Sequence, residues 1–325
     1  MRRLIPVTLL AAMLCMLSAV PALAQSFPAK PVRIVVPYPA GGSTDVIARA
    51  LARELSTLWA QPVVVENISG AGSIIGAEKV ATASPDGHTL LLTIDPTVVH
   101  NRFLYKKLPY DPDKSLIPVT MIARSGQFVI VHPSVTANNL RELVELARRT
   151  PGKIAYASYG IGTQTHLLFE TLGKREGVQF LHVPYKGVAP ATAAAVSGEV
   201  QASVGSPAAT GAMVKAGRVK ALAIGGPRRA NLYPDVPTIA ESGYPYAAAI
   251  IWFGLFAPGG TDPQLVERIS RDATGIVKRP EFTDKYIAAF SLDLVANTPA
   301  EFAATIRADV EVISEMVKAA GVHPE

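Results

Sequence analysis

Cysteine is nearly missing from this 325-residue chain: Cys15 is its only copy. It lies in "MRRLIPVTLLAAMLCMLSAVPALAQS", which joins two arginines, an apolar run and the small-residue site Ala22-Leu23-Ala24, the three parts of a secretory signal peptide. A membrane anchor would need about 20 apolar residues, and Pro21 interrupts the run. We therefore expect cleavage after Ala24, leaving a mature chain without disulfides, a thiolate nucleophile or a cysteine metal site.

Charge is also sparse, because only 18% of the residues are Asp, Glu, Lys or Arg, whereas 49% are hydrophobic. The formal net charge of +5 falls by two when Arg2 and Arg3 leave with the signal peptide. The remaining basic residues are scattered along the chain rather than clustered. A nucleic-acid partner is therefore not expected, and the composition predicts a globular protein with one large core or two moderate ones.

Familiar catalytic motifs are missing as well. The sequence contains no G-x-S-x-G, S-x-x-K or H-E-x-x-H pattern. None of its six histidines is paired with another at a spacing of three or four residues, as a metal site on one helix would require. We expect no catalytic residues, no metal site and no cofactor.

The mature chain alternates short β-branched runs with longer Ala-rich segments at helical spacing, which is an α/β pattern. Its length favours two lobes. The predicted strands are 32–38, 61–67, 88–94, 127–133, 153–158, 179–185, 200–205 and 219–226, and the predicted helices are 44–59, 74–83, 139–150, 165–176 and 189–199.

Two glycine loops each join a predicted strand to a predicted helix. In "VPYPAGGSTD", Gly41 and Gly42 allow close approach of a ligand to backbone, and the free N–H groups of the helix start favour a carboxylate or phosphate. Plain capping by Ser43 or Thr44, with Asp45 complementing the helix dipole, explains the same residues. "SYGIGTQTH" repeats the arrangement in the other half of the chain, so the two loops together could hold one anion across a cleft.

A third loop, "ENISGAGSIIGAEK", has glycines at 70, 72 and 76. It resembles a dinucleotide-binding fingerprint, with Asp95 ending the next strand, but its spacing is G-x-G-x-x-x-G rather than G-x-G-x-x-G. We interpret it as a turn that leads into a packed helix.

Many ordered segments together resemble the Bug family, the solute receptors of tripartite tricarboxylate transporters of the TctC type. They include "FPAKPVRIVVPYPAGGSTDVIARALARELS", "QPVVVENISGAGSIIGAEKVA", "SPDGHTLLLT", "HVPYKG", "DVPTIAESGYP", "WFGLFAPGGT" and "TPAEFAATIRAD". The resemblance implies a periplasmic binding protein of type II, with two α/β lobes and a central ligand cleft. The expected lobes are 25–124 plus 245–325 and 125–244, with crossings near 122–127 and 244–253.

The resemblance further implies a monomeric periplasmic receptor, not an enzyme, that passes a small carboxylate to membrane permease subunits. Two alternatives stay open: a ligand sensor for a signalling system and a periplasmic enzyme acting on a carboxylated substrate. The expected ligand contacts are Tyr38, Ala40, Gly41, Gly42, Ser43 and Asp45 in the first loop, and Ser158, Gly160, Gly162, Thr163, His166, Gly205 and Ser206 in the second lobe.

One departure from the family pattern concerns the ligand class. Where many relatives carry an acidic residue at the end of a second-lobe strand, this chain has Gly205 and Ser206. A ligand ammonium group in a closed cleft requires a carboxylate partner. We therefore expect aliphatic or aromatic di- or tricarboxylates to be preferred over amino acids.

Overall fold

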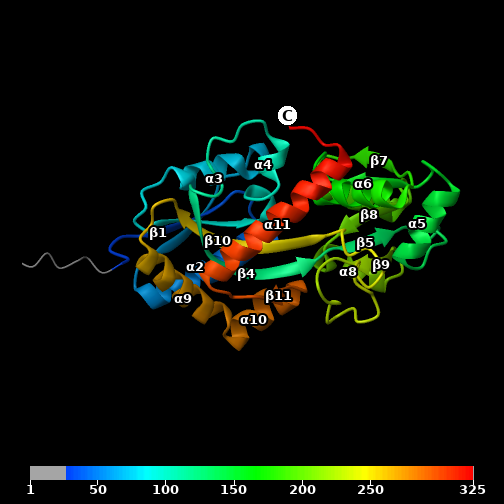
Figure 1. Ribbon diagram of the computed structural model, residues 1–325. Helices are drawn as coiled ribbons and strands as arrows, with labels where there is room; N and C mark the ends of the chain where they lie inside the picture. The colour runs from blue at the N-terminus through cyan, green and yellow to red at the C-terminus, as the bar shows by residue number, and fades with distance from the viewer. Residues whose placement is uncertain (1–26, 325) are drawn as a thin grey trace, which may run out of the picture.

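The computed structural model describes residues 27–324, which form two α/β lobes, each built on its own sheet (Figure 1). The predicted α/β class is confirmed. All eight predicted strands and all five predicted helices are present. The signal peptide predicted for residues 1–24 lies outside the described residues.

Lobe 1 contains a six-stranded sheet in the order β11-β4-β10-β3-β1-β2. The strands β1, β2 and β3 run parallel to one another, whereas β10 runs antiparallel to both of its neighbours and β11 runs antiparallel to β4. The strands are β1 (Val32–Val36), β2 (Val63–Asn67), β3 (Thr89–Ile94), β4 (Leu116–Gly126), β10 (Ile250–Pro258) and β11 (Asp293–Leu294).

Lobe 2 contains a five-stranded sheet in the order β7-β6-β8-β5-β9, in which β5 runs antiparallel to both of its neighbours. The strands are β5 (Phe128–Val131), β6 (Ala155–Ser158), β7 (Leu181–Pro184), β8 (Ala202–Gly205) and β9 (Lys220–Ile224). Its helices are α5 (Leu140–Arg149), α6 (Gln164–Glu176), α7 (Val188–Ser197) and α8 (Pro207–Lys215).

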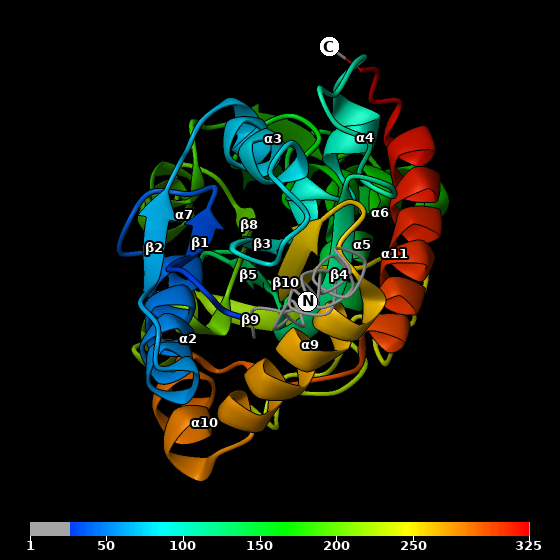
Figure 2. The same cartoon turned by 90° about the vertical axis from the view of Figure 1, so that its left-hand side faces the viewer.

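The helices of lobe 1 cover both faces of its sheet, with α3 and α4 on one side and α2, α9 and α10 on the other (Figure 2). Their bounds are α2 (Ser43–Trp59), α3 (Ile74–Ala81), α4 (Asn101–Leu104), α9 (Pro263–Val277), α10 (Pro280–Tyr286) and α11 (Pro299–Ala320). Three short 3₁₀ helices complete the chain: η1 (Ala71–Ser73), η2 (Asp95–Thr97) and η3 (Ala288–Phe290).

The strands in the middle of each sheet are largely buried on both faces, as the covering helices require. In β1, Val32, Ile34 and Val36 pack against the α2 and α9 side, while Val35 faces the opposite cluster. In β5, Phe128 and Ile130 point to one side of the lobe 2 sheet and Val129 and Val131 to the other. β5 therefore is a continuous apolar run, and β1 is apolar except at the exposed Arg33.

The C-terminal helix α11 connects the lobes, since it packs on β4 in lobe 1 and on α6 in lobe 2 (Figure 1). Phe302 near its start lies in the same core cluster as Met316 and Val317 near its end. A capping box fixes its first turn: Thr298 accepts from the Glu301 N–H, and the Glu301 carboxylate accepts from the Thr298 N–H.

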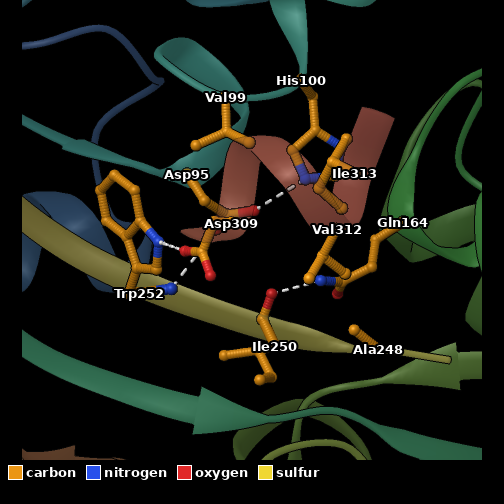
Figure 3. Close-up of a pocket in the computed structure, with 10 residues that line it drawn as sticks. All are labelled: Asp95, Val99, His100, Gln164, Ala248, Ile250, Trp252, Asp309, Val312 and Ile313. Carbon is orange, nitrogen blue, oxygen red and sulfur yellow. Dashed lines mark hydrogen bonds and ion pairs between the residues drawn. The ribbon is translucent and has the colours of Figure 1, made fainter. Parts of the chain in front are cut away.

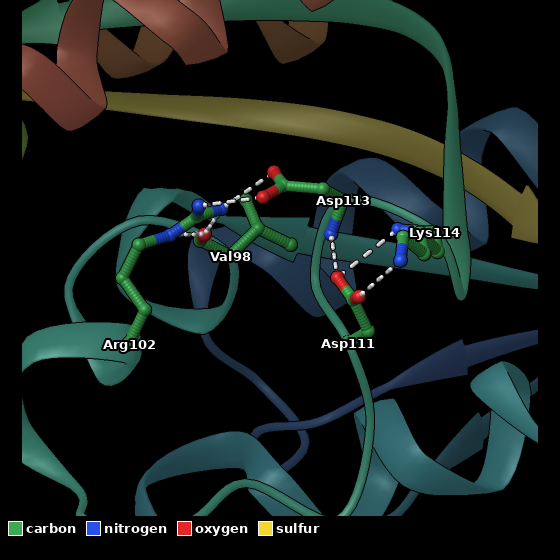
Figure 4. A network of polar contacts seen from close by, with 5 residues as sticks. All are labelled: Val98, Arg102, Asp111, Asp113 and Lys114. Carbon is green, nitrogen blue, oxygen red and sulfur yellow. Dashed lines mark hydrogen bonds and ion pairs between the residues drawn. The ribbon is translucent and has the colours of Figure 1, made fainter.

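A polar network holds the segment that follows β3 (Figure 4). The Arg102 guanidinium donates to the Val98 carbonyl and, through both terminal nitrogens, to the Asp113 carboxylate at 3.0 Å. Asp111 accepts from the backbone N–H groups of Asp113 and Lys114. The network ties α4 to the chain that enters β4, and so fixes α4 beside the space between the lobes.

The chain passes between the lobes twice, and at both crossings a glycine packs tightly against neighbouring backbone. The first crossing lies between the end of β4 at Gly126 and the start of β5 at Phe128, and the second lies between β9 and β10. A Cβ on Gly126 would lie 1.7 Å from the Gly225 carbonyl oxygen, and one on Gly225 would lie 1.8 Å from that of Ala249. The division into 25–124 plus 245–325 and 125–244 remains a prediction, since the sheets alone do not define domain limits.

The crossing leads to a prediction about stability. Gly126→Ala should lower the free energy of unfolding by about 3 kcal/mol, because the methyl group must displace backbone. The matched control is Gly275→Ala in α9, where a Cβ meets nothing within 4 Å, and which should raise stability by about 1 kcal/mol. Urea unfolding measures both. A Gly126→Ala protein as stable as wild type would contradict the described packing.

Candidate functional site

A cavity of about 710 Å³ lies between the two sheets. Its walls come from loops that follow the carboxyl ends of parallel strands, the place where open α/β sheets bind ligands. Gln127 and Ile251 belong to the chain near the crossings and complete the wall. The lobe 1 wall comprises 37–39, 69–73, 94–96, 100–101 and 104–105, and the lobe 2 wall comprises 159–164, 188 and 205–206.

The structure brings about half of the predicted contact residues to this cavity. Those on its wall are Tyr38, Gly160, Gly162, Thr163, Gly205 and Ser206. Those away from it are Ala40, Gly41, Gly42, Ser43, Asp45, Ser158 and His166. That any residue of either group contacts the ligand stays a prediction. Physical reasons explain why residues of the second group lie away from the cavity wall.

Asp45 organises the first loop from within. Its carboxylate accepts hydrogen bonds from the Gly41 N–H at 2.9 Å, from Arg49 Nε at 3.0 Å and from Asn67 Nδ2 at 2.9 Å. Burial opposes ionisation of the group, but these hydrogen bonds outweigh it and hold the pKa of Asp45 below its ordinary value. Asp45 therefore shapes the turn, while residues 40–42 are exposed.

His166 is built into the wall behind the second loop. Its Nδ1 accepts the Gly162 N–H at 3.0 Å, and its ring stacks on His182 with centroids 4.2 Å apart. His182 stacks in turn on Tyr156, and its Nε2 lies 2.6 Å from the Ser158 hydroxyl. Burial lowers the pKa of His166, and burial together with His166 lowers the pKa of His182 to about 4. Both rings are neutral at neutral pH and support the loop.

The third glycine loop forms part of the cavity wall, which its interpretation as a packed turn missed. Ala71, Gly72 and Ser73 all have positive φ, at 44°, 60° and 78°, and so turn the chain sharply into α3. Ser73 Oγ lies 2.8 Å from Thr97 Oγ1, which also contacts Tyr38 Oη at 3.0 Å. A non-glycine residue such as Ser73 held in this backbone region is typical of ligand sites.

One carboxylate, Asp95, lines the cavity, and both of its oxygens have partners within the protein (Figure 3). One oxygen pairs with His100 Nε2 at 3.1 Å, and the other accepts the Trp252 backbone N–H at 3.3 Å. Below it, Asp309 of α11 accepts the Trp252 indole N–H at 2.8 Å. Burial raises the pKa of Asp309 to about 6. The cluster joins η2, β10 and α11.

Two contacts across the cavity bring the lobes together. The Leu104 side chain of lobe 1 packs on Gly162 of lobe 2, so closely that a Cβ on Gly162 would lie 2.1 Å from it. The Gln164 side chain at the start of α6 donates to the Ile250 carbonyl of β10 (Figure 3). The contact at position 162 therefore depends on glycine, because any side chain there would push against Leu104.

The described wall of the cavity contains no Lys or Arg. The wall instead carries the starts of helices α3, α6, α7 and α8. The first N–H groups of a helix generally have no partners inside it, although at α8 the Ser206 hydroxyl already accepts the Ala209 N–H. The positive ends of these helices favour an anion. Within residues 27–324 no helix combines the length and hydropathy of a membrane span, and no group of His, Cys, Asp and Glu is arranged to hold a metal ion.

Residues 47–322 match the model of the tripartite tricarboxylate transporter family receptor, TctC. The chain belongs to this receptor family. The members of this family are periplasmic solute-binding receptors. The solved structures of this type confirm the predicted fold of two lobes around a ligand cleft.

Individual relatives agree with the family match. The protein BugT of Bordetella pertussis is 34% identical over 305 residues, which cover 93% of each chain. The periplasmic binding protein BugD is 33% identical with a TM-score of 0.76, over 92% of this receptor and 100% of that chain. The R. palustris protein Rpa4515, solved with adipate, is 29% identical with a TM-score of 0.80, over 92% of this receptor and 100% of that chain.

The exposed first loop can be tested at Gly42. Its φ of −76° and ψ of 167° suit any residue, and a Cβ there would have its nearest neighbour at 3.9 Å. If the loop backbone contacts the ligand, Gly42→Val should obstruct that approach and weaken binding by more than tenfold, about 1.4 kcal/mol, without unfolding the protein. Calorimetric titration with adipate measures the change. Affinity within about threefold of wild type would show that the loop is structural.

Proposed function

We propose that this receptor captures a small di- or tricarboxylate, aliphatic or aromatic, in the periplasm and delivers it to the permease of a tripartite tricarboxylate transporter. The observation that supports it best is the cavity between the lobes, which gathers helix starts from both lobes and carries no Lys or Arg on its described wall. A relative solved with adipate supports the ligand class.

A cavity of this kind binds an anion through fixed dipoles rather than through a counter-charge. Backbone N–H groups at helix starts are already oriented, so they bind a carboxylate without first leaving a salt bridge. Asp95 is compatible with an anion because His100 and the Trp252 N–H already use its oxygens. The one carboxylate of the described wall therefore has both of its oxygens engaged within the protein.

The apolar side chains of the wall fit the body of an organic acid. Leu104 and Ile251 line the cavity from lobe 1 and its crossing, and Ile161 and Val188 line it from lobe 2. Ile161 and Val188 are 58% and 47% exposed and so offer apolar surface at the cavity wall. A ligand with a hydrocarbon body between acid groups would bury this surface.

The proposal has further parts that follow from the family. The protein acts as a receptor that leaves its ligand chemically unchanged, and it works as a monomer. It is exported to the periplasm, where its signal peptide is cleaved after Ala24. One chain supplies both walls of the cavity, so a second copy is not needed to form the site.

Ser206 offers the sharpest test of the ligand class. Gly205 is a poor position, since a Cβ there would lie 2.5 Å from the Thr210 side chain. Ser206 instead lines the cavity and caps α8, its hydroxyl accepting the Ala209 N–H at 3.1 Å. Asp and Asn both preserve such a cap. Ser206→Asp should therefore add a negative charge without loosening the helix.

We expect Ser206→Asp to weaken adipate and malate binding by about tenfold or more, equivalent to 1.4 kcal/mol, through like-charge repulsion. Ser206→Asn, the neutral control, should bind within about threefold of wild type. Thermal shifts and calorimetry measure both. Wild-type protein that responds to amino acids and to no dicarboxylate, or equal affinities of the Asp and Asn variants, would contradict the proposal.

A further inference from the structure

Gln127 occupies the first crossing and is held there by backbone contacts on both sides. Its N–H donates to the Ala249 carbonyl at 2.7 Å, and its own carbonyl accepts the Gly225 N–H at 2.8 Å. Only 6% of the residue is exposed. The backbone of Gln127 is thus fixed by the second crossing, and the residue forms part of the cavity wall.

The side-chain amide of Gln127 carries a buried hydrogen-bonding group without a partner. Its nitrogen makes no hydrogen bond to any residue between 27 and 324. Leaving such a donor unsatisfied costs about 1–3 kcal/mol, and native proteins do so at few places. Because the residue belongs to the cavity wall and not to an apolar core, a ligand atom that reached the amide would supply the missing partner.

The neighbours of Gln127 identify the part of the ligand that it meets. Phe128 pairs with Gly205 in the antiparallel contact of β5 with β8, so Gln127 lies level with Ser206 at the start of α8. On the other side, Gly126 pairs with Ile250 of β10. Gln127 therefore stands where the lobe 2 wall meets the crossings.

We propose that the Gln127 side-chain amide donates a hydrogen bond to an acid group of the ligand and makes the receptor select a carboxylate at that end. The inference rests on the proposed function, because it assumes a ligand with at least two acid groups, one bound at Gln127 and another elsewhere in the cavity. A donor selects an acceptor, and a carboxylate is the strongest acceptor available in an organic acid.

The amide can rotate by half a turn, which would present its carbonyl oxygen to the ligand instead. In that orientation Gln127 would favour an amide or ammonium group. Each dicarboxylate has a half-amide of nearly the same shape, and comparing the two reports directly which atom of Gln127 faces the ligand.

The test compares adipate with its half-amide and succinate with its half-amide, by calorimetry at mildly alkaline pH, on wild type, Gln127→Glu and Gln127→Met. Wild type should prefer each diacid. Gln127→Glu keeps the shape and replaces the donor with a carboxylate, so it should weaken the diacid by about tenfold or more and reverse the preference toward the half-amide, whose NH₂ can donate to Glu.

Gln127→Met has similar length and no donor, so it should lose the preference without reversing it. It also keeps the test valid if the Glu variant does not fold, and the melting temperature of each ligand-free variant reports folding independently. A change in structure alone would weaken the diacid and the half-amide equally.

The possible results separate the two proposals. Reversal in Gln127→Glu, or loss of the preference in Gln127→Met, supports the role of Gln127. Wild type that binds the diacids, with diacid to half-amide ratios in both variants within about threefold of wild type, overturns this inference and leaves the proposed function standing. Wild type that binds none of the probes overturns the proposed ligand class and the inference with it.

Discussion

The packing of backbone against backbone where the chain crosses between the lobes is the constraint on which the site depends. Gly126 and Gly225 approach neighbouring carbonyls so closely that a side chain on either would overlap them. The long strands β4 and β10 pair up to this point, Gly126 opposite Ile250, so the lobe 1 sheet leads directly into the crossings. The same contact fixes Gln127 and sets the distance between the two walls of the cavity.

A second connection runs through α11 and limits how the lobes can move. Trp252 of β10 links the cavity to this helix, because its backbone N–H donates to Asp95 and its indole N–H to Asp309. The Gln164 hydrogen bond to Ile250 lies beside this cluster (Figure 3), and the Leu104 contact with Gly162 also joins the two lobes. A ligand that touches both walls would favour the state in which these contacts form, by its difference in affinity for the two states.

The sequence predicted those elements whose signals are local. Strands such as 32–38 and 127–133 are short β-branched runs, and the helix at 44–59 carries an apolar stripe, so periodicity alone identifies them. The strand β4 was missed because Pro118 lies inside it and argues against a strand. The structure accommodates this proline next to a register shift in the pairing with β10. Neither the strand β10 nor the helix α11 is among the elements that the sequence predicts.

The residues of the site could likewise be predicted only where the sequence carries a local signal. Glycine loops after strands marked Tyr38, Gly160 and Gly162 as candidates, and the structure places all three on the cavity wall. The loop at 69–73 carried the same glycine signal, but its likeness to an imperfect nucleotide fingerprint hid its place. Asp45 and His166 could not be told from wall residues, because their partners Arg49 and His182 become neighbours only through helix geometry and sheet pairing. Nothing local distinguishes Gln127, whose position depends on backbone contacts with Gly225 and Ala249, far along the chain.

The central claim is that a carboxylate binds between the lobes and favours their closure. Small-angle X-ray scattering of the ligand-free protein, with and without saturating adipate, malate or succinate, tests it most directly. The account predicts that at least one of these dicarboxylates reduces the radius of gyration. Scattering profiles that stay unchanged with every one of them, at concentrations where calorimetry shows binding, would contradict closure around the ligand.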